Sequence, residues 1–327
     1  MSSSLSSQMQ GSILVEDGGA FDVSAMMLRH FVEMGNDPLL WRMYLEITRL
    51  SVWTIIITFA LEATSPGETW KLLRHSPGLY MKGVAANFLN HFVVAPLMFV
   101  LYLRYSLLAG KSHLDCDPSR VAFDIWGVPD YSYCRGFDLS HVVIETLAIL
   151  LIQAIGYYLA HMAMHTKSLY WTHRFHHRFN IVVVPVTANS VSAAEYVIAY
   201  MLPIFIGTVL FKPSLPALFS AGFTISLCNI LIHTPILHWA SEFLPSIFVS
   251  TSGHMDHHRK LSRNFAAPTL NVDWLVSFLL PKLSEKRRSK IFVERGDRED
   301  AVDHGGEKEV PRKTLRKSLD EDFACES

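Results

Sequence analysis

The chain has 327 residues, half of them hydrophobic, with a formal net charge of −1 at pH 7. This composition is too apolar for an ordinary soluble protein, and nothing in its charge indicates a nucleic-acid partner. The four cysteines are scattered without CxxC spacing, which excludes a common zinc ribbon and a disulfide-dense scaffold. We therefore expect a membrane protein that binds no nucleic acid.

Residues 1–45 are expected to form a polar N-terminal region. The opening sequence MSSSLSSQMQGSILVEDGG is rich in serine and contains acidic residues. A secretory signal would instead need a basic end followed by an apolar core. Insertion into the membrane should therefore depend on internal segments.

Five internal stretches approach the length of about 20 apolar residues that a membrane-spanning helix needs. They are LSVWTIIITFAL from Leu50, GVAANFLNHFVVAPLMFVLYL from Gly83, LSHVVIETLAILLIQAIGYYLA from Leu139, AAEYVIAYMLPIFIGTVLF from Ala193 and SLPALFSAGFTISLCNILI from Ser214. The first is short and could be interfacial or tilted. Only Lys212 and Pro213 join the last two, which should form a hairpin. Residues 46–283 are thus predicted to form an all-α, polytopic membrane helix bundle with four or five membrane segments.

Basic residues near the helix ends predict the orientation of this bundle, because cytosolic loops carry an excess of Lys and Arg. Three basic residues follow the third segment and four follow the fifth: Lys167, Arg174 and Arg178, then Arg259, Lys260, Arg263 and Lys282. Both regions should therefore be cytosolic. The loop 109–138 would be lumenal, where Cys116 and Cys134 could form a disulfide or remain free thiols. Residues 284–327 mix both signs of charge and are predicted to be a solvated, disordered tail.

Histidines concentrate between residues 161 and 258, where ten of the chain's 16 lie. Their spacings are HxxxH, HxxHH, HxxxxH and HxxHH, and residues three or four apart share a helix face. Imidazole is a common ligand of iron, copper and zinc, and neutral imidazoles are mutually compatible around cations. Ten imidazoles suffice for two metal ions and are too many for a single zinc. The expected metal ligands are His161, His165, His173, His176, His177, His233, His238, His254, His257 and His258.

Two acidic residues are candidates for orienting these ligands. Glu195 lies within an apolar segment, where an ionisable group is costly and usually functional. Asp256, inside HMDHH, could accept a ring N–H from a ligand, although a solvated acid at a helix end explains it too. Glu145 is equally well explained as an interfacial acid. The six isolated histidines are expected to be interfacial anchors or hydrogen-bonded core residues: His30, His75, His91, His113, His141 and His304.

The histidine pattern discriminates between several metal chemistries. HMAMH lacks the glutamate of HExxH, so a metalloprotease would have no general base. A haem with two histidine ligands would leave the HxxHH sets unexplained. Two irons with positions open to dioxygen fit better, because such a centre can oxidise unactivated C–H or C=C bonds. A non-catalytic membrane sensor that keeps the metal as a structural staple is the alternative from another class.

The motifs LYWTHRFHH, GHMDHH and NFAAPTLNVDWL resemble the fatty acid hydroxylase superfamily over roughly residues 139–280. This superfamily includes sterol desaturases, sterol methyl oxidases and cholesterol hydroxylases. The resemblance implies a multi-pass endoplasmic-reticulum enzyme with a cytosolic histidine cluster, two Fe (Fe2+ when reduced), O2, and electrons derived from NAD(P)H. It assigns the histidines to three boxes, 161–165, 173–177 and 254–258. His233 and His238 occupy the place of the intermediate histidines, but their separation of five is looser than the family pattern and leaves open which of the two is a ligand. No fused cytochrome b5 signature occurs, so an external donor is expected, either cytochrome b5 with its reductase or a cytochrome P450 reductase.

Departures from the family pattern bear on the substrate. Ser192 and Ala193 replace a His-Pro pair that many sterol-acting members carry, although Glu195 matches the glutamate that follows it, and Val272 replaces a tryptophan. The stretch VVPVTANSVSAAEYVIAYMLPIFIG resembles the alternative squalene epoxidase branch, which implies epoxidation of squalene to 2,3-epoxysqualene. The alternative is a sterol or fatty-acyl hydroxylase or desaturase, of the C4-methyl oxidase, C5-desaturase or 25-hydroxylase type.

Overall fold

The computed structural model describes residues 38–108, 122–123, 129–130, 138–180 and 182–279. Three predictions lie outside these residues: the solvated tail at 284–327, the state of Cys116 and Cys134, and most of the N-terminal region 1–45. They stay predictions, as do the proposed domain boundaries. Helix α2 starts at Pro38, ahead of both the boundary at residue 46 and the apolar stretch from Leu50.

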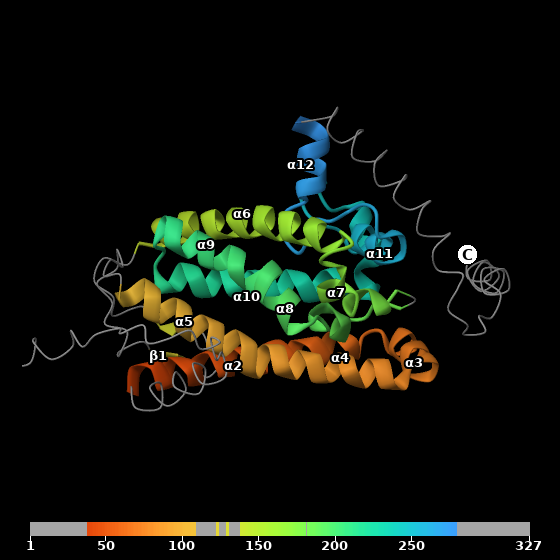
Figure 1. Cartoon of the computed structure of the whole chain (residues 1–327), viewed down its shortest axis with the longest axis horizontal. Coiled ribbons are helices and arrows are strands. Elements are labelled where there is room, and N and C mark those ends of the chain that lie inside the picture. The colour runs from red at the N-terminus through yellow and green to blue at the C-terminus, as the bar shows by residue number, and fades with distance from the viewer. Residues whose placement is uncertain (1–37, 109–121, 124–128, 131–137, 181, 280–327) are drawn as a thin grey trace, which may run out of the picture.

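Helices α2 (Pro38–Glu62), α4 (Pro77–Leu89) and α5 (Ala95–Leu108) form one layer of the bundle (Figure 1). A π-helical turn, η1 (Asn90–Val94), joins α4 to α5 without a break, and α5 packs along α2. The short helix α3 (Pro66–His75) links α2 to α4. Helices α3 and α4 each begin with proline, which needs no backbone N–H partner at that position.

The second layer consists of α6 (Leu139–Met164), α9 (Leu202–Phe211) and α10 (Leu215–Ile232), which lie side by side (Figure 1). Helix α8 (Ala193–Glu195) and the π-helix η5 (Tyr196–Met201) lead into α9. The hairpin between α9 and α10 turns at Lys212, which has a left-handed φ of 47°. Glu145 of α6 accepts hydrogen bonds from Ser214 N at 3.0 Å and Ser214 Oγ at 2.6 Å. Its carboxylate therefore ties α6 to the start of α10.

Short elements gather at one end of the bundle (Figure 1). They are α7 (Tyr170–His173), the 3-10 helices η3 (His176–Arg178), η4 (Pro185–Asn189) and η6 (Pro235–Glu242), and helices α11 (Thr251–Lys260) and α12 (Val272–Leu279). A two-residue antiparallel pair, β1 (Ala122–Phe123) and β2 (Pro129–Asp130), completes the described elements.

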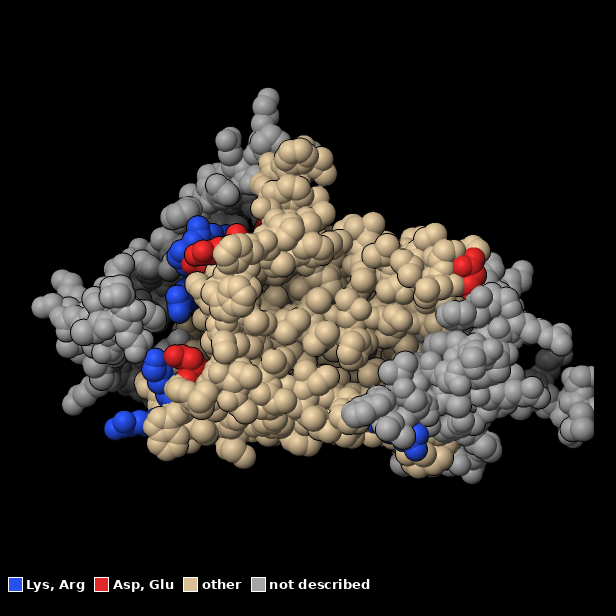
Figure 2. Space-filling view, turned by 180° about the vertical axis from the view of Figure 1, so that it is seen from behind, with Lys and Arg blue, Asp and Glu red and all other residues tan. Residues whose placement is uncertain are grey.

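Three helical stretches are long and apolar enough to cross a membrane: Pro77–Leu101, Leu139–Met164 and Ala193–Phe211. Two bent helix pairs, Ile47–Glu62 with Pro66–His75 and Pro216–Ile232 with Pro235–Glu242, turn by 94° and 95° and raise the number to five if each is one span. Leu147, Leu151, Ile155 and Leu159 form an exposed apolar stripe along α6, and Figure 2 shows a broad face without charged side chains. The predicted all-α membrane bundle is confirmed.

Close contact between α6 and α9 depends on Gly156. A Cβ atom at this position would lie 2.7 Å from Cβ of Pro203 and 2.9 Å from its Cγ. Gly156→Ala is expected to push the helices apart and destabilise the protein by roughly 1–3 kcal/mol, as overpacking does. Thermal unfolding in detergent measures this. The control is Gly78→Ala, where a Cβ would meet nothing within 4 Å; equal melting temperatures for both variants would contradict the expectation.

Candidate metal centre

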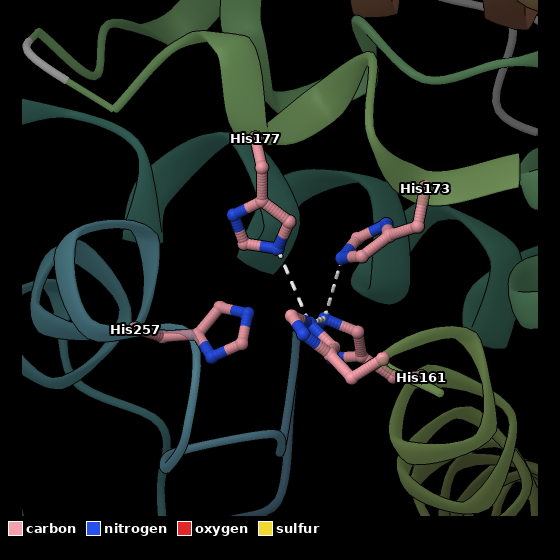
Figure 3. Close-up of side chains that lie close together, drawn as sticks. His161, His173, His177 and His257 are labelled. Atoms are coloured by element: carbon pink, nitrogen blue, oxygen red, sulfur yellow. Dashed lines mark hydrogen bonds between the residues drawn. The ribbon is translucent and has the colours of Figure 1, made fainter. Parts of the chain in front are cut away.

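Nine of the ten predicted histidines converge in two adjoining groups at the end of the bundle that carries α7 and α11. Within each group, one nitrogen of every ring lies within 4.8 Å of the corresponding nitrogens of the others. Group 1 contains His161, His165, His173, His177 and His257, and group 2 contains His176, His233, His254 and His258. Figure 3 shows four rings of group 1 pointing toward one another from α6, α11 and the α7–η3 segment.

The two HxxHH motifs divide their histidines between the groups in the same way. Each places its first and last histidine in one group and its middle histidine in the other. His173 and His177 belong to group 1 and His176 to group 2; His254 and His258 belong to group 2 and His257 to group 1. Residues four apart share a helix face, while a residue three along points further round it. The groups therefore adjoin, and the rings of His177 and His258 lie 5.2 Å apart across them.

Backbone and carboxylate acceptors assign the ring proton of several ligands. His161 Nδ1 donates to Phe265 O at 2.7 Å, and His173 Nδ1 donates to Glu195 Oε1 at 2.7 Å. Both Nε2 atoms then carry lone pairs, yet they lie only 2.8 Å apart. Two lone pairs at this distance repel each other unless a cation lies between or beside them. The donor set therefore fits a metal ion.

Group 2 and His257 repeat this arrangement. His233 Nδ1 donates to Asn229 O at 2.7 Å and His257 Nδ1 donates to Arg263 O at 2.8 Å. Nε2 of His233 lies 3.0 Å from Nε2 of His254, and Nε2 of His257 has no hydrogen-bond partner among the described residues. Proteins orient histidine ligands in this way: one ring nitrogen donates to a carbonyl, which directs the other nitrogen toward the metal.

Most of the cluster is buried, which keeps its imidazoles neutral. Burial is the main cause that holds the pKa of His173, His177 and His258 well below the ordinary histidine range, and neighbouring imidazoles add to it. Burial likewise lowers the pKa of His257 to about 4. Neutral rings present lone pairs at physiological pH, as metal binding requires.

Three predicted site residues differ in their placement. Glu195 is fully buried and contacts His173, as an orienting carboxylate would. Asp256 instead pairs with Lys260 at 2.6 Å and with Arg263, so no ring N–H occupies it among the described contacts. His238 is exposed on η6 and belongs to neither group, because the chain turns sharply between α10 and η6. The structure therefore does not bring His238 to the site.

A buried segment beneath the cluster, residues 184–191, is held by side chains that the sequence analysis missed. Asn87 Nδ2 donates to Val186 O at 2.6 Å, and Asn90 Nδ2 donates to Asn189 O at 3.1 Å and to the carbonyl at 191. Asn229 Nδ2 donates to the carbonyl at 188, at 3.0 Å. Polar side chains within apolar helices were the available signal, because such groups are costly in a membrane without a partner.

Glu195 should affect metal affinity through His173. Glu195→Ala removes the acceptor of His173 Nδ1 and should lower iron affinity about 10- to 100-fold, while Glu195→Gln keeps an acceptor oxygen and should restore part of it. Iron titration of the purified protein, followed by elemental analysis, measures this.

The matched control is Asp256→Asn, which weakens the ion pairs with Lys260 and Arg263 but removes no hydrogen-bond acceptor from a histidine ring, so iron affinity should be nearly unchanged. A loss for Asp256→Asn as large as that for Glu195→Ala would show that carboxylates act here through general electrostatics.

Comparison with known protein families gives a match over part of the chain. The sequence model of the fatty acid hydroxylase family matches residues 146–277, which include all nine histidines of the two groups. No curated protein and no solved structure matches the chain. The family comprises hydroxylases and desaturases, typically iron-dependent, which agrees with the buried histidine groups and the apolar helices. The match over residues 146–277 thus supports the resemblance to the fatty acid hydroxylase and sterol desaturase superfamily, and with it a membrane oxidoreductase.

Proposed function

We propose that this protein is a non-haem di-iron oxygenase that uses O2 to oxidise a membrane lipid. The observation that carries the proposal is the division of nine histidines, all but His165 buried, into adjoining sets of five and four. A structural zinc site needs four ligands in a closed tetrahedron. Five imidazoles in group 1 exceed that need, and their all-nitrogen donor set suits a redox-active iron.

Two iron ions, when bound, supply the reduction of dioxygen. One oxygen atom enters the lipid and the other leaves as water, which consumes two electrons and two protons for each hydroxylation or epoxidation. The groups would each hold one ion, group 1 through five nitrogens and group 2 through four. The protein's part is to hold these ligands, to orient His173 through Glu195, and to exclude water by burial.

The electrons have to come from outside the chain. We propose cytochrome b5 with its reductase, or a cytochrome P450 reductase, using NAD(P)H. Basic residues after α6 and in the last turn of α11, among them Lys167, Arg174 and Arg259, lie close in sequence to the histidine motifs and support a cytosolic face for the site. The endoplasmic reticulum is the proposed location, in keeping with the family resemblance.

For the substrate, two classes remain under this proposal. The resemblance of residues 183–207 to alternative squalene epoxidases supports epoxidation of squalene. The family match supports hydroxylation or desaturation of a sterol or fatty-acyl lipid. Expression in a sterol-requiring host that lacks squalene epoxidase separates them, because only an epoxidase restores growth and consumes the accumulated squalene.

Each histidine group should be needed for turnover. His177→Ala in group 1 and His258→Ala in group 2 should each lower bound iron from two ions per chain toward one. Lipid oxidation should fall by at least about 100-fold. Loss of a residue that only hydrogen-bonds to a metal ligand already costs about 10- to 100-fold, and loss of the ligand itself should cost more. Bound iron is counted by elemental analysis, and activity is followed as 18O from 18O2 appearing in lipid.

His238→Ala is the matched control, since this histidine is exposed and outside both groups. It should keep both iron ions and full activity. Stoichiometric zinc with no 18O incorporation in a metal-replete preparation would contradict the oxygenase and favour the structural staple.

A further inference from the structure

A small cavity lies between the two layers of the bundle, next to the histidine groups. Helices α2, α5, α9 and α10 supply apolar side chains to it, including Leu50, Phe99, Ile204 and Leu218. Its volume is about 70 Å3. This is smaller than the cavity of about 150 Å3 that encloses benzene, so it accommodates one end of a lipid while the remainder extends between helices.

Polar side chains meet at this cavity through a series of contacts. The ring of His91 lies 6.3 Å from that of Tyr196, which stacks on Tyr200 at 5.6 Å. Tyr200 OH donates to Asn229 Oδ1 at 3.4 Å, and Asn229 Nδ2 donates to Asn189 Oδ1 at 3.2 Å. All five residues line the cavity.

Two of these polar groups have no partner. His91 Nε2 and Asn189 Nδ2 are buried and make no hydrogen bond to any described residue, and both side chains are only 3% exposed. The other polar atoms of Asn189 are engaged, because its Oδ1 accepts from Asn229 and its backbone carbonyl accepts from Asn90. A buried polar group without a hydrogen-bond partner costs free energy. A ligand atom that bonds to both groups would remove this cost.

The same contacts connect the cavity to the metal centre. Tyr200 packs edge-on against Tyr157 at 5.0 Å, and Tyr157 packs edge-on against His161 of group 1 at 5.2 Å. The backbone carbonyl of Asn229 accepts from His233 of group 2. A lipid end held in the cavity is therefore separated from both histidine groups by only one or two side chains.

We propose that this cavity binds the uncharged, oxygen-bearing end of the lipid substrate, with His91 and Asn189 as its hydrogen-bond partners. Naming the ligand as the substrate rests on the proposed function. A hydroxyl oxygen accepts from Asn189 Nδ2 and pairs with His91 Nε2 as donor or acceptor. No Asp, Glu, Lys or Arg side chain lines the cavity, so a carboxylate would be buried without a counter-ion. This favours an alcohol such as a sterol over squalene or a free fatty acid.

Binding of matched probes to the full-length, iron-loaded protein tests this inference. The probes are cholesterol with its 3-deoxy analogue, and hexadecanol with hexadecane, measured in detergent without reductant so that no turnover occurs. In at least one pair the alcohol should bind at least tenfold more tightly, equivalent to 1.4 kcal/mol. His91→Phe, which keeps a ring but loses the nitrogen, should abolish most of this preference, and His91→Gln should restore part of it.

The control is His141→Phe, at an exposed site near the start of α6, which should keep the preference. If His91→Phe fails to fold, Gly222→Leu offers a second route. A Cβ at Gly222 meets nothing within 4 Å, so a leucine there should fill the cavity and lower alcohol affinity at least tenfold.

Equal binding of alcohol and hydrocarbon in both pairs would overturn the inference, as would a preference that survives His91→Phe or an alcohol affinity unchanged by Gly222→Leu. Those results would mean that water alone satisfies the two groups. Iron content and 18O incorporation report separately on the proposed function. If the protein binds zinc and does not turn over but still prefers the alcohol, the assignment of the cavity's ligand stands. The proposed oxygenase function is then refuted.

Discussion

Imidazole lone pairs directed at one another are the constraint on which the rest of this structure depends. His161 and His173 each donate a hydrogen bond from Nδ1 to an oxygen. Their Nε2 atoms therefore carry no proton, and they face each other at 2.8 Å without a hydrogen between them. In a dry interior this arrangement is unfavourable until a cation is bound. The surrounding carbonyls and Glu195 keep the rings in that position.

Polar side chains within apolar helices provide the mechanical support for this centre. Asn87, Asn90 and Asn229 come from helical elements in both layers, yet all three donate to the backbone between residues 184 and 191. Glu62 accepts from the backbone N–H of Val186 in the same segment. Because a membrane offers no water to replace these hydrogen bonds, each of them stabilises the contact between the two layers. The segment therefore lies fixed beneath the rings.

Sequence reasoning worked best where a local period carries the signal. The apolar stretches from Gly83, Leu139 and Ala193 correspond to helices of membrane-spanning length, and the turn at Lys212 makes the expected hairpin. It did not decide between competing partners that lie near one another in the sequence. Asp256 lies beside histidines in sequence but faces Lys260 and Arg263, since its side chain points away from the cluster on α11.

The histidine spacing and the apolar stretches by themselves determined that an all-α membrane bundle gathers histidines that could hold a metal, because helical periodicity places residues three and four apart on nearby faces. Only the tertiary structure decided how those histidines divide. Neighbours such as His176 and His177 belong to different groups, and His238 to neither. It also placed His91, an isolated histidine in sequence, in a cavity beside the cluster. The physical reason is that ligand sets and cavities form where separate helices meet, and no local spacing encodes that meeting point.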